Sequence, residues 1–391
     1  MKAVTWQGIG EISVQDVPDP RLEADTDAII RVTAASISGA DLHRLRALGP
    51  FMTPGDVLGH ETAGEVVEIG DSVQRLHTGD RVVIPAVIAC GQCAQCLAGR
   101  SAQCETTRQR EHDAGAARYG HGVLHGSVPG GQAEYLRVRL ADANAIRVDA
   151  GLPDERSLLL GDALPAALQA VEAASLRERQ VLGVVGLGAF GQLTARLARH
   201  RGLRVIGIDP VPQRRELAEQ HGIEVLDSGD DALDALRDLT SGEGPDAMVD
   251  AVGLQADGDP AAAFSQSAVG GMPQPLARQL ARTASIDRLT ALLLALRGVA
   301  RGGTVVVAGE YCGSSDRLPL GEMVDKQLRL QLGHTAAHGR WQRLMPLVAD
   351  PADPLGLGEI VTHEGSLDEA PGLYELFERR AEGCLKVVLR P

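Results

Sequence analysis

A glycine-rich turn between an apolar run and a helix-like run is the feature that most constrains the fold of this chain. Residues 186–191 read GLGAFG, preceded by VLGVV at 181–185 and followed by QLTARLARH at 192–200. The next apolar run, 203–208, ends in Asp209, 18 residues after the motif. GxGxxG alone is weak evidence, but between a strand and a helix, with an acid about 20 residues further on, it predicts a dinucleotide-binding βαβ unit.

The residue types of this unit fit a nicotinamide dinucleotide. Glycines let the backbone approach a pyrophosphate at the N-terminus of the next helix, where partial positive charge favours an anion. We expect Asp209 to bind both ribose hydroxyls and to repel a 2′-phosphate, which predicts NAD as the cofactor. Arg214 is interpreted either as a neighbour of the adenosine end or as a surface arginine. The predicted turn comprises Gly186, Gly188, Ala189, Phe190 and Gly191.

The rest of the chain predicts an α/β fold with two domains. A chain of 391 residues is longer than one ordinary hydrophobic core requires. The first third holds short Val- and Ile-rich runs, including 28–33, 65–69 and 81–84, which predict strands. Further along, apolar runs alternate with helical stretches, which indicates a doubly wound parallel sheet. These later runs include 247–252, 303–309 and 328–333. The Ala-, Gly- and Pro-rich segment 254–286 interrupts the alternation and is predicted to be an inserted loop with at most one helix.

Composition narrows the possible partners. The net charge of −14 argues against nucleic acid and anionic membranes as partners, because it would repel polyanions, but it says little about small-molecule substrates. The sequence contains no apolar run near the roughly 20 residues of a membrane helix, and its N-terminus does not look like a secretory signal. We therefore expect a cytoplasmic enzyme.

Four of the six cysteines are close together in the sequence, at Cys90, Cys93, Cys96 and Cys104. Three at a spacing of three, with a fourth eight positions later, can place four thiolates tetrahedrally around one zinc ion. Because protein ligands would fill all four positions, the predicted zinc is structural. An iron–sulfur cluster is the alternative interpretation. The nearby histidines His112, His121 and His125 are interpreted as solvated loop side chains.

Taken together, these motifs resemble the medium-chain zinc alcohol dehydrogenase family over essentially the whole chain. The resemblance includes GHETAGEVVEIG at 59–70, GGQAEYLRV at 130–138 and the closing GCLKVVLRP. The DALP motif and the long insertion make it most similar to the glutathione-independent formaldehyde dehydrogenase subgroup. The resemblance implies a split GroES-like catalytic domain, 1–164 with 336–391, and a Rossmann domain at 165–335. It also implies a homodimer or homotetramer, and it adds as cofactor-binding positions Val252, Gly309, Gly333 and Thr335.

The resemblance also implies a catalytic zinc site, from which this chain departs. His60 and Asp162 match two of the ligands, with Glu61 beside the metal and Asp41 as the partner of His60. The third ligand position holds Ser38, a neutral hydroxyl and a much poorer zinc donor than a thiolate.

A second departure concerns proton transfer. Ala40 stands where the family has a hydroxyl that passes the substrate proton toward the histidine represented here by His43. Ser38, His43 and Glu61 are the candidate proton donors or hydrogen-bond partners for the substrate. A relic site, in which these polar residues have no catalytic duty, is the other interpretation.

These departures shape the expected function. We expect an NAD-dependent oxidoreductase that transfers hydride to or from a small organic substrate, by chemistry other than simple zinc alcohol oxidation. Reduction of an activated C=N or C=C bond, or carbonyl chemistry without a full catalytic zinc site, would suit the residues. The alternatives are an ordinary zinc-dependent alcohol or aldehyde dehydrogenase, a redox-neutral enzyme with tightly bound NAD, and a non-enzymatic binding protein.

Overall fold

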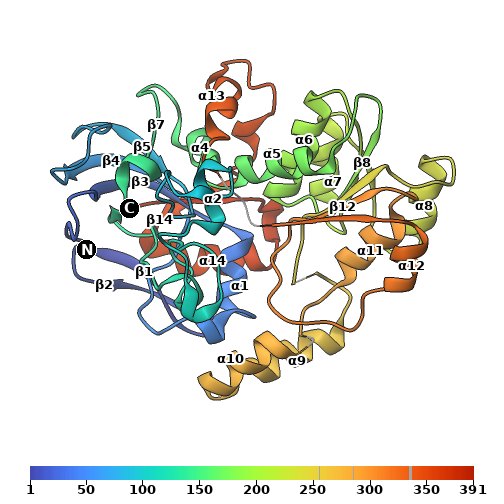
Figure 1. Ribbon diagram of the computed structural model, residues 1–391, viewed down its shortest axis with the longest axis horizontal. Helices are drawn as coiled ribbons and strands as arrows, with labels where there is room; N and C mark the ends of the chain where they lie inside the picture. The colour runs from blue at the N-terminus through green and yellow to red at the C-terminus, as the bar shows by residue number, and fades with distance from the viewer. Residues whose placement is uncertain (255, 285, 334–336) are drawn as a thin grey trace. The chain divides into compact units, whose positions relative to one another are not determined.

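The computed structural model describes residues 1–254, 256–284, 286–333 and 337–391. It divides into two compact units (Figure 1). The first comprises Met1–Pro165 and Thr335–Pro391, and the second comprises Ala166–His334. The predicted cofactor residue Thr335 lies outside the described residues.

The second unit contains a six-stranded parallel sheet. Its strand order is β10-β9-β8-β11-β12-β13, the doubly wound order of a Rossmann fold. The strands are β8 (Val181–Val185), β9 (Arg204–Ile208), β10 (Glu224–Leu226), β11 (Ala247–Asp250), β12 (Thr304–Val307) and β13 (Arg329–Leu332). The main helices around it are α6 (Ala189–His200), α7 (Pro212–Gln220), α8 (Ala232–Leu239) and α11 (Thr290–Gly298).

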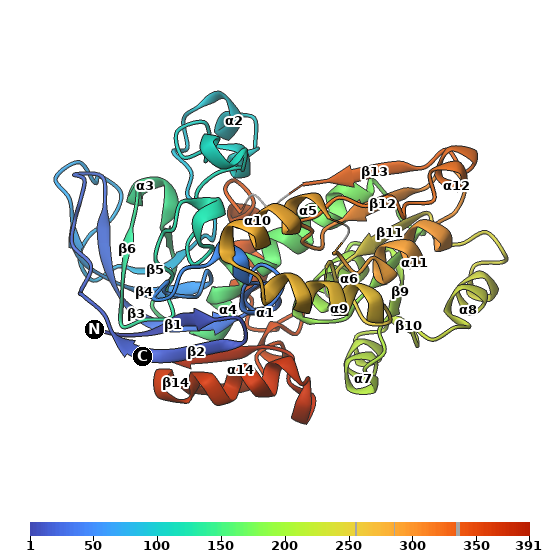
Figure 2. The same ribbon diagram turned by 90° about the horizontal axis from the view of Figure 1, so that it is seen from below.

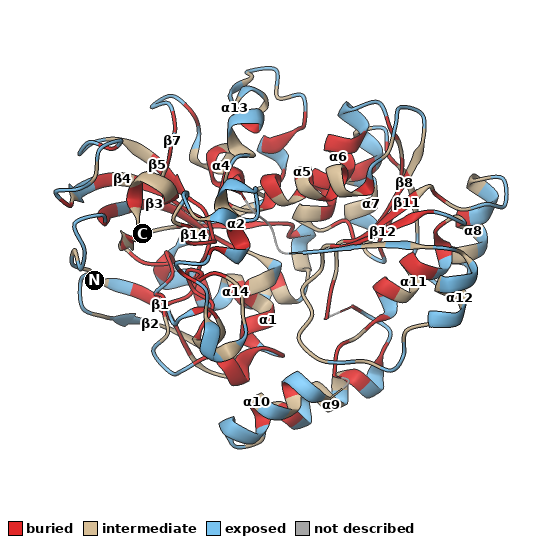
Figure 3. Ribbon diagram, in the orientation of Figure 1, coloured by how far each residue is buried: buried red, intermediate tan, exposed pale blue. Residues whose placement is uncertain are grey.

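Burial explains why these strands are continuous apolar runs. The central strands β8, β11 and β12 are buried almost throughout (Figure 3), so both of their faces carry apolar side chains. The edge strand β13 is largely exposed. The α/β fold class predicted from the alternating runs is confirmed.

The segment 254–286 differs from its prediction. It forms two helices, α9 (Pro260–Gly270) and α10 (Gln274–Thr283), which follow each other along the chain (Figure 2). The expectation of a loop with at most one helix was wrong. Asp259 caps α9 by accepting a hydrogen bond from the Ala262 backbone N–H at 3.0 Å, and Pro260 occupies the first helical turn.

The first unit is built around a seven-stranded, mostly antiparallel sheet. Its order is β14-β15-β3-β4-β5-β7, with β6 paired to β3. The strands are β3 (Ala28–Ile37), β4 (Thr62–Ile69), β5 (Arg81–Ile84), β6 (Tyr135–Val138), β7 (Ile146–Arg147), β14 (His363–Ser366) and β15 (Val387–Arg390). Because β15 pairs with β3, the C-terminal segment completes the sheet that the N-terminal segment begins.

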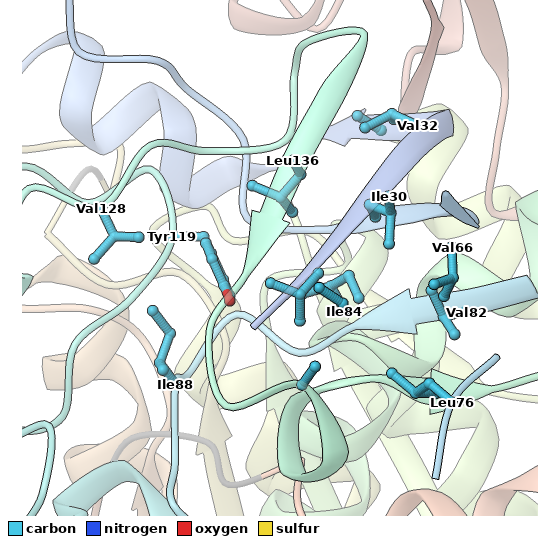
Figure 4. Close-up of a cluster of buried hydrophobic side chains, with 14 of the residues drawn as sticks. Ile30, Val32, Val66, Leu76, Val82, Ile84, Ile88, Tyr119, Val128 and Leu136 are labelled. Atoms are coloured by element: carbon cyan, nitrogen blue, oxygen red, sulfur yellow. The ribbon is translucent and has the colours of Figure 1, made fainter. Parts of the chain in front are cut away.

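Side chains from several strands and from the loop after the cysteines form one core of this unit. Figure 4 shows Tyr119 among Ile84, Ile88 and Leu136. The Tyr119 hydroxyl accepts a hydrogen bond from the Arg139 backbone N–H at 3.0 Å. This hydrogen bond fixes the loop that carries Tyr119 to the sheet. The same loop carries His121, which lies at the candidate site described below. Among the described residues, no helix is long and apolar enough to cross a membrane.

Candidate functional site

The four cysteines come together as the sequence predicts. One ligand atom from each of Cys90, Cys93, Cys96 and Cys104 lies within 4.8 Å of all the others. The Sγ atoms of Cys90 and Cys96 are 4.0 Å apart, as are those of Cys93 and Cys104. A zinc ion with Zn–S bonds of about 2.3 Å would separate tetrahedral ligands by about 3.8 Å, so the residues fit this ion.

Backbone amides support the thiolate form of Cys90 and Cys93 in this lobe. The N–H of Cys93 donates to Cys90 Sγ at 3.3 Å, and the N–H of Glu105 donates to Cys93 Sγ at 3.4 Å. Hydrogen bonds from the backbone N–H groups of Cys96 and Glu105 lower the pKa of Cys93. A lowered thiol pKa favours metal binding because the thiolate is the ligand.

A second cluster surrounds His60, which lies two residues before β4. One ligand atom each from His60, Glu61 and Asp162 lies within 4.8 Å of the others. His60 Nε2 is 3.8 Å from Asp162 Oδ2 and 3.2 Å from Ser38 Oγ. These donors could hold one metal ion through an imidazole nitrogen and oxygen atoms, without any sulfur. Ser38 therefore lies beside this cluster, and its role as a donor stays a prediction.

Asp41 fixes the orientation of His60. The ring atom His60 Nδ1 lies 3.2 Å from Asp41 Oδ1, and both side chains are buried. The other Asp41 oxygen accepts a hydrogen bond from the Ser38 backbone N–H at 2.8 Å, at the start of α1 (Gly39–Leu45). Burial alone would lower the pKa of His60, but Asp41, Asp162 and Glu61 together raise it. With Nδ1 held by Asp41, Nε2 is the atom that faces Ser38 and Asp162.

Glu61 has two buried partners that the sequence analysis missed. Its Oε2 accepts hydrogen bonds from Lys386 Nζ and Ser36 Oγ. Glu61 and Lys386 each expose only 2% of their side chains. Burial alone would raise the pKa of Glu61, but Lys386 and His60 lower it. The only signal for Lys386 in the sequence is a single cation directly before the apolar run of β15.

Asp162 directly precedes α5 (Ala163–Ala174) and is the most accessible carboxylate of the cluster, with a side chain 30% exposed. Its partial burial raises its pKa, and His60 opposes this effect. Asp162 is therefore the group of this cluster best able to hold a proton or to bind a metal ion. His43 lies on α1, is buried and does not belong to the three-residue cluster.

Two further histidines continue from His60 in a chain of ring contacts. The ring of His121 contacts that of His60 at a centroid distance of 5.1 Å, and the ring of His125 contacts that of His121 at 5.6 Å. Both are buried, so the interpretation of them as solvated loop side chains was wrong. Nδ1 of His121 is 2.7 Å from the carbonyl oxygen of Tyr119 and donates to it. Because a distant segment brings these rings to His60, local sequence gave no signal for the contact.

The glycine-rich turn has the geometry of a phosphate-binding loop. Gly186, with φ +92°, ends β8, and a Cβ at this position would lie 2.5 Å from Val252 Cγ2. A Cβ at Gly191 would lie 1.8 Å from the carbonyl oxygen of Gly186. Gly188 is the N-cap of α6, whose first residues are Ala189 and Phe190. Gly186 and Gly191 therefore have to be glycine for the turn to keep this shape, which can present backbone N–H groups to a pyrophosphate.

Asp209 follows β9 at the neighbouring strand end and is buried. Its carboxylate accepts hydrogen bonds from the Leu187 N–H at 2.7 Å and from the Val211 N–H at 2.8 Å. Each oxygen retains a second lone pair for a ligand hydroxyl. Arg214 Nη1 lies 3.8 Å from Asp209 Oδ2, and a Cβ on Gly188 would be 3.8 Å from the same Arg214 atom. The side chain of Arg214 therefore lies beside the turn and is 17% exposed.

The remaining predicted cofactor positions follow strand ends on the same edge of the sheet. Val252 comes after β11, Gly309 after β12 and Gly333 after β13. In doubly wound sheets, ligands bind at the carboxyl ends of the strands. A Cβ on Gly309 would lie 2.4 Å from the Gly253 backbone nitrogen, so these two loops are packed backbone to backbone.

Comparison with known families agrees with both halves of this description. Residues 24–149 match the alcohol dehydrogenase GroES-like domain family, and residues 189–271 match the zinc-binding dehydrogenase family. The chain is 33% identical over 398 residues to the uncharacterized zinc-type alcohol dehydrogenase-like protein AdhB of Bacillus subtilis, and the alignment covers 100% of both chains.

Two further similarities concern characterised chemistry and a solved structure. Formaldehyde dismutase of Pseudomonas putida is 29% identical over 405 residues, with 97% of this chain and 95% of that protein covered. The structure of alcohol dehydrogenase TADH from Thermus sp. ATN1 matches with a TM-score of 0.81 at 32% identity, covering 100% of this chain and 99% of that one.

Proposed function

The chain belongs to the zinc-type alcohol dehydrogenase family, and we propose that it transfers hydride between NAD and a small organic substrate by a route other than simple zinc alcohol oxidation. As a member of this family it is a nicotinamide-dependent oxidoreductase. The observation that carries the proposal is Ser38 Oγ, 3.2 Å from His60 Nε2, in the position where a thiolate would anchor a catalytic zinc.

The proposed function uses two sets of residues, one that would bind NAD and one around His60 that would bind the substrate. Bound NAD would accept or supply the hydride, and its pyrophosphate would lie on the turn at Gly186, Gly188 and Gly191. Asp209 would hold the adenosine ribose, which supports NAD rather than NADP. A zinc ion between His60 and Asp162 would polarise the substrate oxygen.

The side chains around His60 prepare that second site. Asp41 keeps His60 Nε2 turned toward the substrate position, while Lys386 and Ser36 hold Glu61 in place. Without a bound metal ion, Asp162, whose pKa is raised, would hold the proton that a reduced substrate takes up.

Two groups are missing at this site, a thiolate at position 38 and a hydroxyl at position 40, and their absence limits which substrates the site can activate. A neutral serine binds zinc much less tightly than a thiolate, and Ala40 has no hydroxyl to pass on a proton. A carbonyl or conjugated C=C substrate that is already activated suits this site better than an unactivated primary alcohol.

The experiment that tests this function compares metal content and turnover. We expect one tightly bound zinc per chain by elemental analysis, oxidation of NADH with conjugated or oxo substrates, and little reduction of NAD with ethanol or propanol. Ethanol turnover equal to that of a thiolate-zinc alcohol dehydrogenase assayed in parallel would refute the proposal.

A redox-neutral reaction with retained NAD is the second candidate, because the α9–α10 insertion is tied to the segments after β11 and β12, which carry the predicted cofactor positions Val252 and Gly309. Gln266 Nε2 donates to the Leu254 carbonyl at 2.9 Å, and Arg317 pairs with Asp259 from the loop after β12. The formaldehyde dismutase relative carries its name for a reaction of this type. Nucleotide that stays with the protein through gel filtration would support this candidate, and complete loss of nucleotide would exclude it.

We also propose that the protein forms homo-oligomers. The exposed edge strand β13 and the adjacent α12 (Leu320–Asp325) carry apolar side chains, with Leu332, Leu320 and Val324 at 71%, 63% and 76% exposure. An exposed strand edge offers unpaired N–H and C=O groups to a second copy. Light scattering at several concentrations measures the subunit number, and a monomer throughout would contradict the proposal.

A further inference from the structure

A buried carboxylate at the end of β11 joins two loops of the second unit. Asp250 is the last residue of β11 and is fully buried. Its Oδ1 accepts hydrogen bonds from the backbone N–H groups of Val252 at 3.0 Å and Gly253 at 3.3 Å. Its Oδ2 accepts a hydrogen bond at 2.5 Å from the hydroxyl of Tyr311, which lies in the loop after β12. One side chain therefore holds both loops.

The backbones of the two loops are also in direct contact. The carbonyl oxygen of Asp250 accepts hydrogen bonds from the N–H groups of Ala308 at 3.1 Å and Gly309 at 2.9 Å. A Cβ on Gly253 would lie 2.7 Å from the backbone nitrogen of Glu310, so the chains approach each other more closely than a side chain allows. The position of one loop therefore fixes the position of the other.

The order of the strands indicates which part of the cofactor these loops face. The pyrophosphate-binding turn follows β8, and Asp209 follows β9, the neighbour of β8 on one side. The neighbour of β8 on the other side is β11, with β12 beyond it. A dinucleotide with its pyrophosphate on the turn and its adenosine ribose at Asp209 would extend its other half toward the ends of β11 and β12. That other half carries the nicotinamide ring, where the hydride is exchanged.

We propose that the Asp250–Tyr311 pair positions the loops after β11 and β12 for the nicotinamide half of NAD. Both are positioning residues, which act on the cofactor through the backbone around Val252 and Gly309. The inference rests on the proposed NAD site and adds the residues that shape one half of it.

The surroundings of the pair explain why Tyr311 matters to Asp250. Among the described residues, no cation forms an ion pair with Asp250. Burial raises the pKa of Asp250, and the hydrogen bond from Tyr311 is the largest effect that opposes this rise. Burial, Asp250 and Asp287 all raise the pKa of Tyr311, so its hydroxyl keeps its proton and remains a donor. A buried carboxylate that has no cation depends on such donors, so loss of the hydroxyl should loosen both loops.

The variant Tyr311→Phe tests the pair with two ligands. NAD has both halves, whereas ADP has the adenosine and two phosphates but no nicotinamide half. We expect the variant to bind NAD about tenfold more weakly than wild type, the scale of one hydrogen bond to a charged group, and to bind ADP within about twofold of wild type. Isothermal titration calorimetry measures both affinities. Unchanged NAD affinity would overturn the proposal, and so would equal losses for NAD and ADP, because they would indicate a general disturbance of the fold.

Two substitutions at Asp250 sharpen the test. Asp250→Asn keeps an oxygen that can accept from the loop amides and an amide that can pair with Tyr311, so much of the NAD affinity should return relative to Asp250→Ala. The ADP affinities of the two variants should be alike. Asp250→Asn that binds NAD no better than Asp250→Ala would contradict the role of these hydrogen bonds.

Asp209→Ser is the matched comparison at the other half of the cofactor. Because Asp209 would hold the adenosine ribose, this variant should lose affinity for ADP and NAD alike, unlike Tyr311→Phe. Wild-type protein that binds neither nucleotide would refute the hydride-transfer function together with this inference. Wild-type protein that binds NAD, with Tyr311→Phe binding it equally well, would refute only the role of the pair.

Discussion

Asp41 Oδ1 lies 3.2 Å from His60 Nδ1, and the same carboxylate accepts the backbone N–H of Ser38 through its other oxygen. Asp41 therefore positions two residues of the candidate metal centre. It holds the imidazole of His60 and the backbone of Ser38 at the start of α1. The arrangement resembles the carboxylate–histidine–metal contacts that orient ligands and strengthen their basicity.

Replacing Asp41 with Asn should weaken metal binding at His60 without altering the four-cysteine site. An outer partner of this kind is typically worth 10- to 100-fold in metal affinity, so we expect a loss of about that size for the second zinc. Equilibrium dialysis against a metal buffer that fixes free zinc measures it. Asp162→Asn, which removes a direct donor, is the reference for a larger loss. A second-zinc affinity within twofold of wild type would show that Asp41 does not position His60.

The four-cysteine lobe should depend on its metal ion. Cys93→Ala removes one of four ligands, so zinc should be lost and the melting temperature should fall, because binding energy at such a site is folding energy. Cys312→Ser is the matched control, since Cys312 lies outside the cluster. Elemental analysis and differential scanning calorimetry read out both proteins. Unchanged zinc content in Cys93→Ala would exclude these cysteines as the zinc site.

Cofactor choice should follow the charge of Asp209. We expect NAD to bind at least tenfold more tightly than NADP, about 1.4 kcal/mol, because Asp209 repels a 2′-phosphate. In Asp209→Ser the nearby Arg214 would face the 2′-phosphate without its carboxylate neighbour, so the preference should shrink or reverse. Asp227→Ser, on the neighbouring strand end, is the control. Equal affinities of the wild-type protein for both nucleotides would show that Asp209 does not contact the ribose.

His338 should make the stability of the first unit depend on pH. Its Nε2 lies 2.9 Å from the buried Asn144 Oδ1, and burial lowers the pKa of His338 to about 4. Because the folded pKa lies below the unfolded value of 6.5, this contribution is complete above pH 6.5 and is lost as pH falls toward 4. For a partly exposed ring we expect a loss of about 1–2 kcal/mol.

Urea unfolding at pH 7.5 and at pH 4.5 tests this prediction. His338→Gln retains a side-chain donor for Asn144 but cannot take up a proton, so its loss of stability between the two pH values should be smaller by that amount. His77→Gln, an exposed position, serves as the control. Equal losses in wild type and His338→Gln would place the acid sensitivity elsewhere.

Local patterns predicted the elements of this fold but not the contacts between distant segments. The run 181–185 and the turn at Gly186 identified β8 and its loop, because apolar runs and glycine constraints act over a few residues. The helices of 254–286 were missed because Ala, Gly and Pro gave that segment weak periodicity. The contact of His121 with His60 and the ion pair of Lys386 with Glu61 join residues far apart in sequence, so only the tertiary structure reveals them.

The strongest test of the proposed chemistry is to restore what the candidate centre lacks. Ser38→Cys combined with Ala40→Ser would supply a thiolate donor next to His60 Nε2 and a hydroxyl at the start of α1. A thiolate binds zinc far more tightly than a hydroxyl, so we expect metal content to rise from about one zinc per chain to about two. Oxidation of a simple alcohol with NAD should then appear, because polarisation of the alcohol oxygen and a proton path are both available.

The single variants separate the two effects. Ser38→Cys alone should raise metal content with little alcohol oxidation, and Ala40→Ser alone should change neither. Elemental analysis of the wild-type protein shows, before any variant is made, whether the chain binds one zinc ion tightly or two. Two tightly bound zinc ions in wild type would mean that serine or water suffices as a ligand. Ordinary zinc-assisted alcohol oxidation would then be the better description of this enzyme, and the double variant should gain nothing.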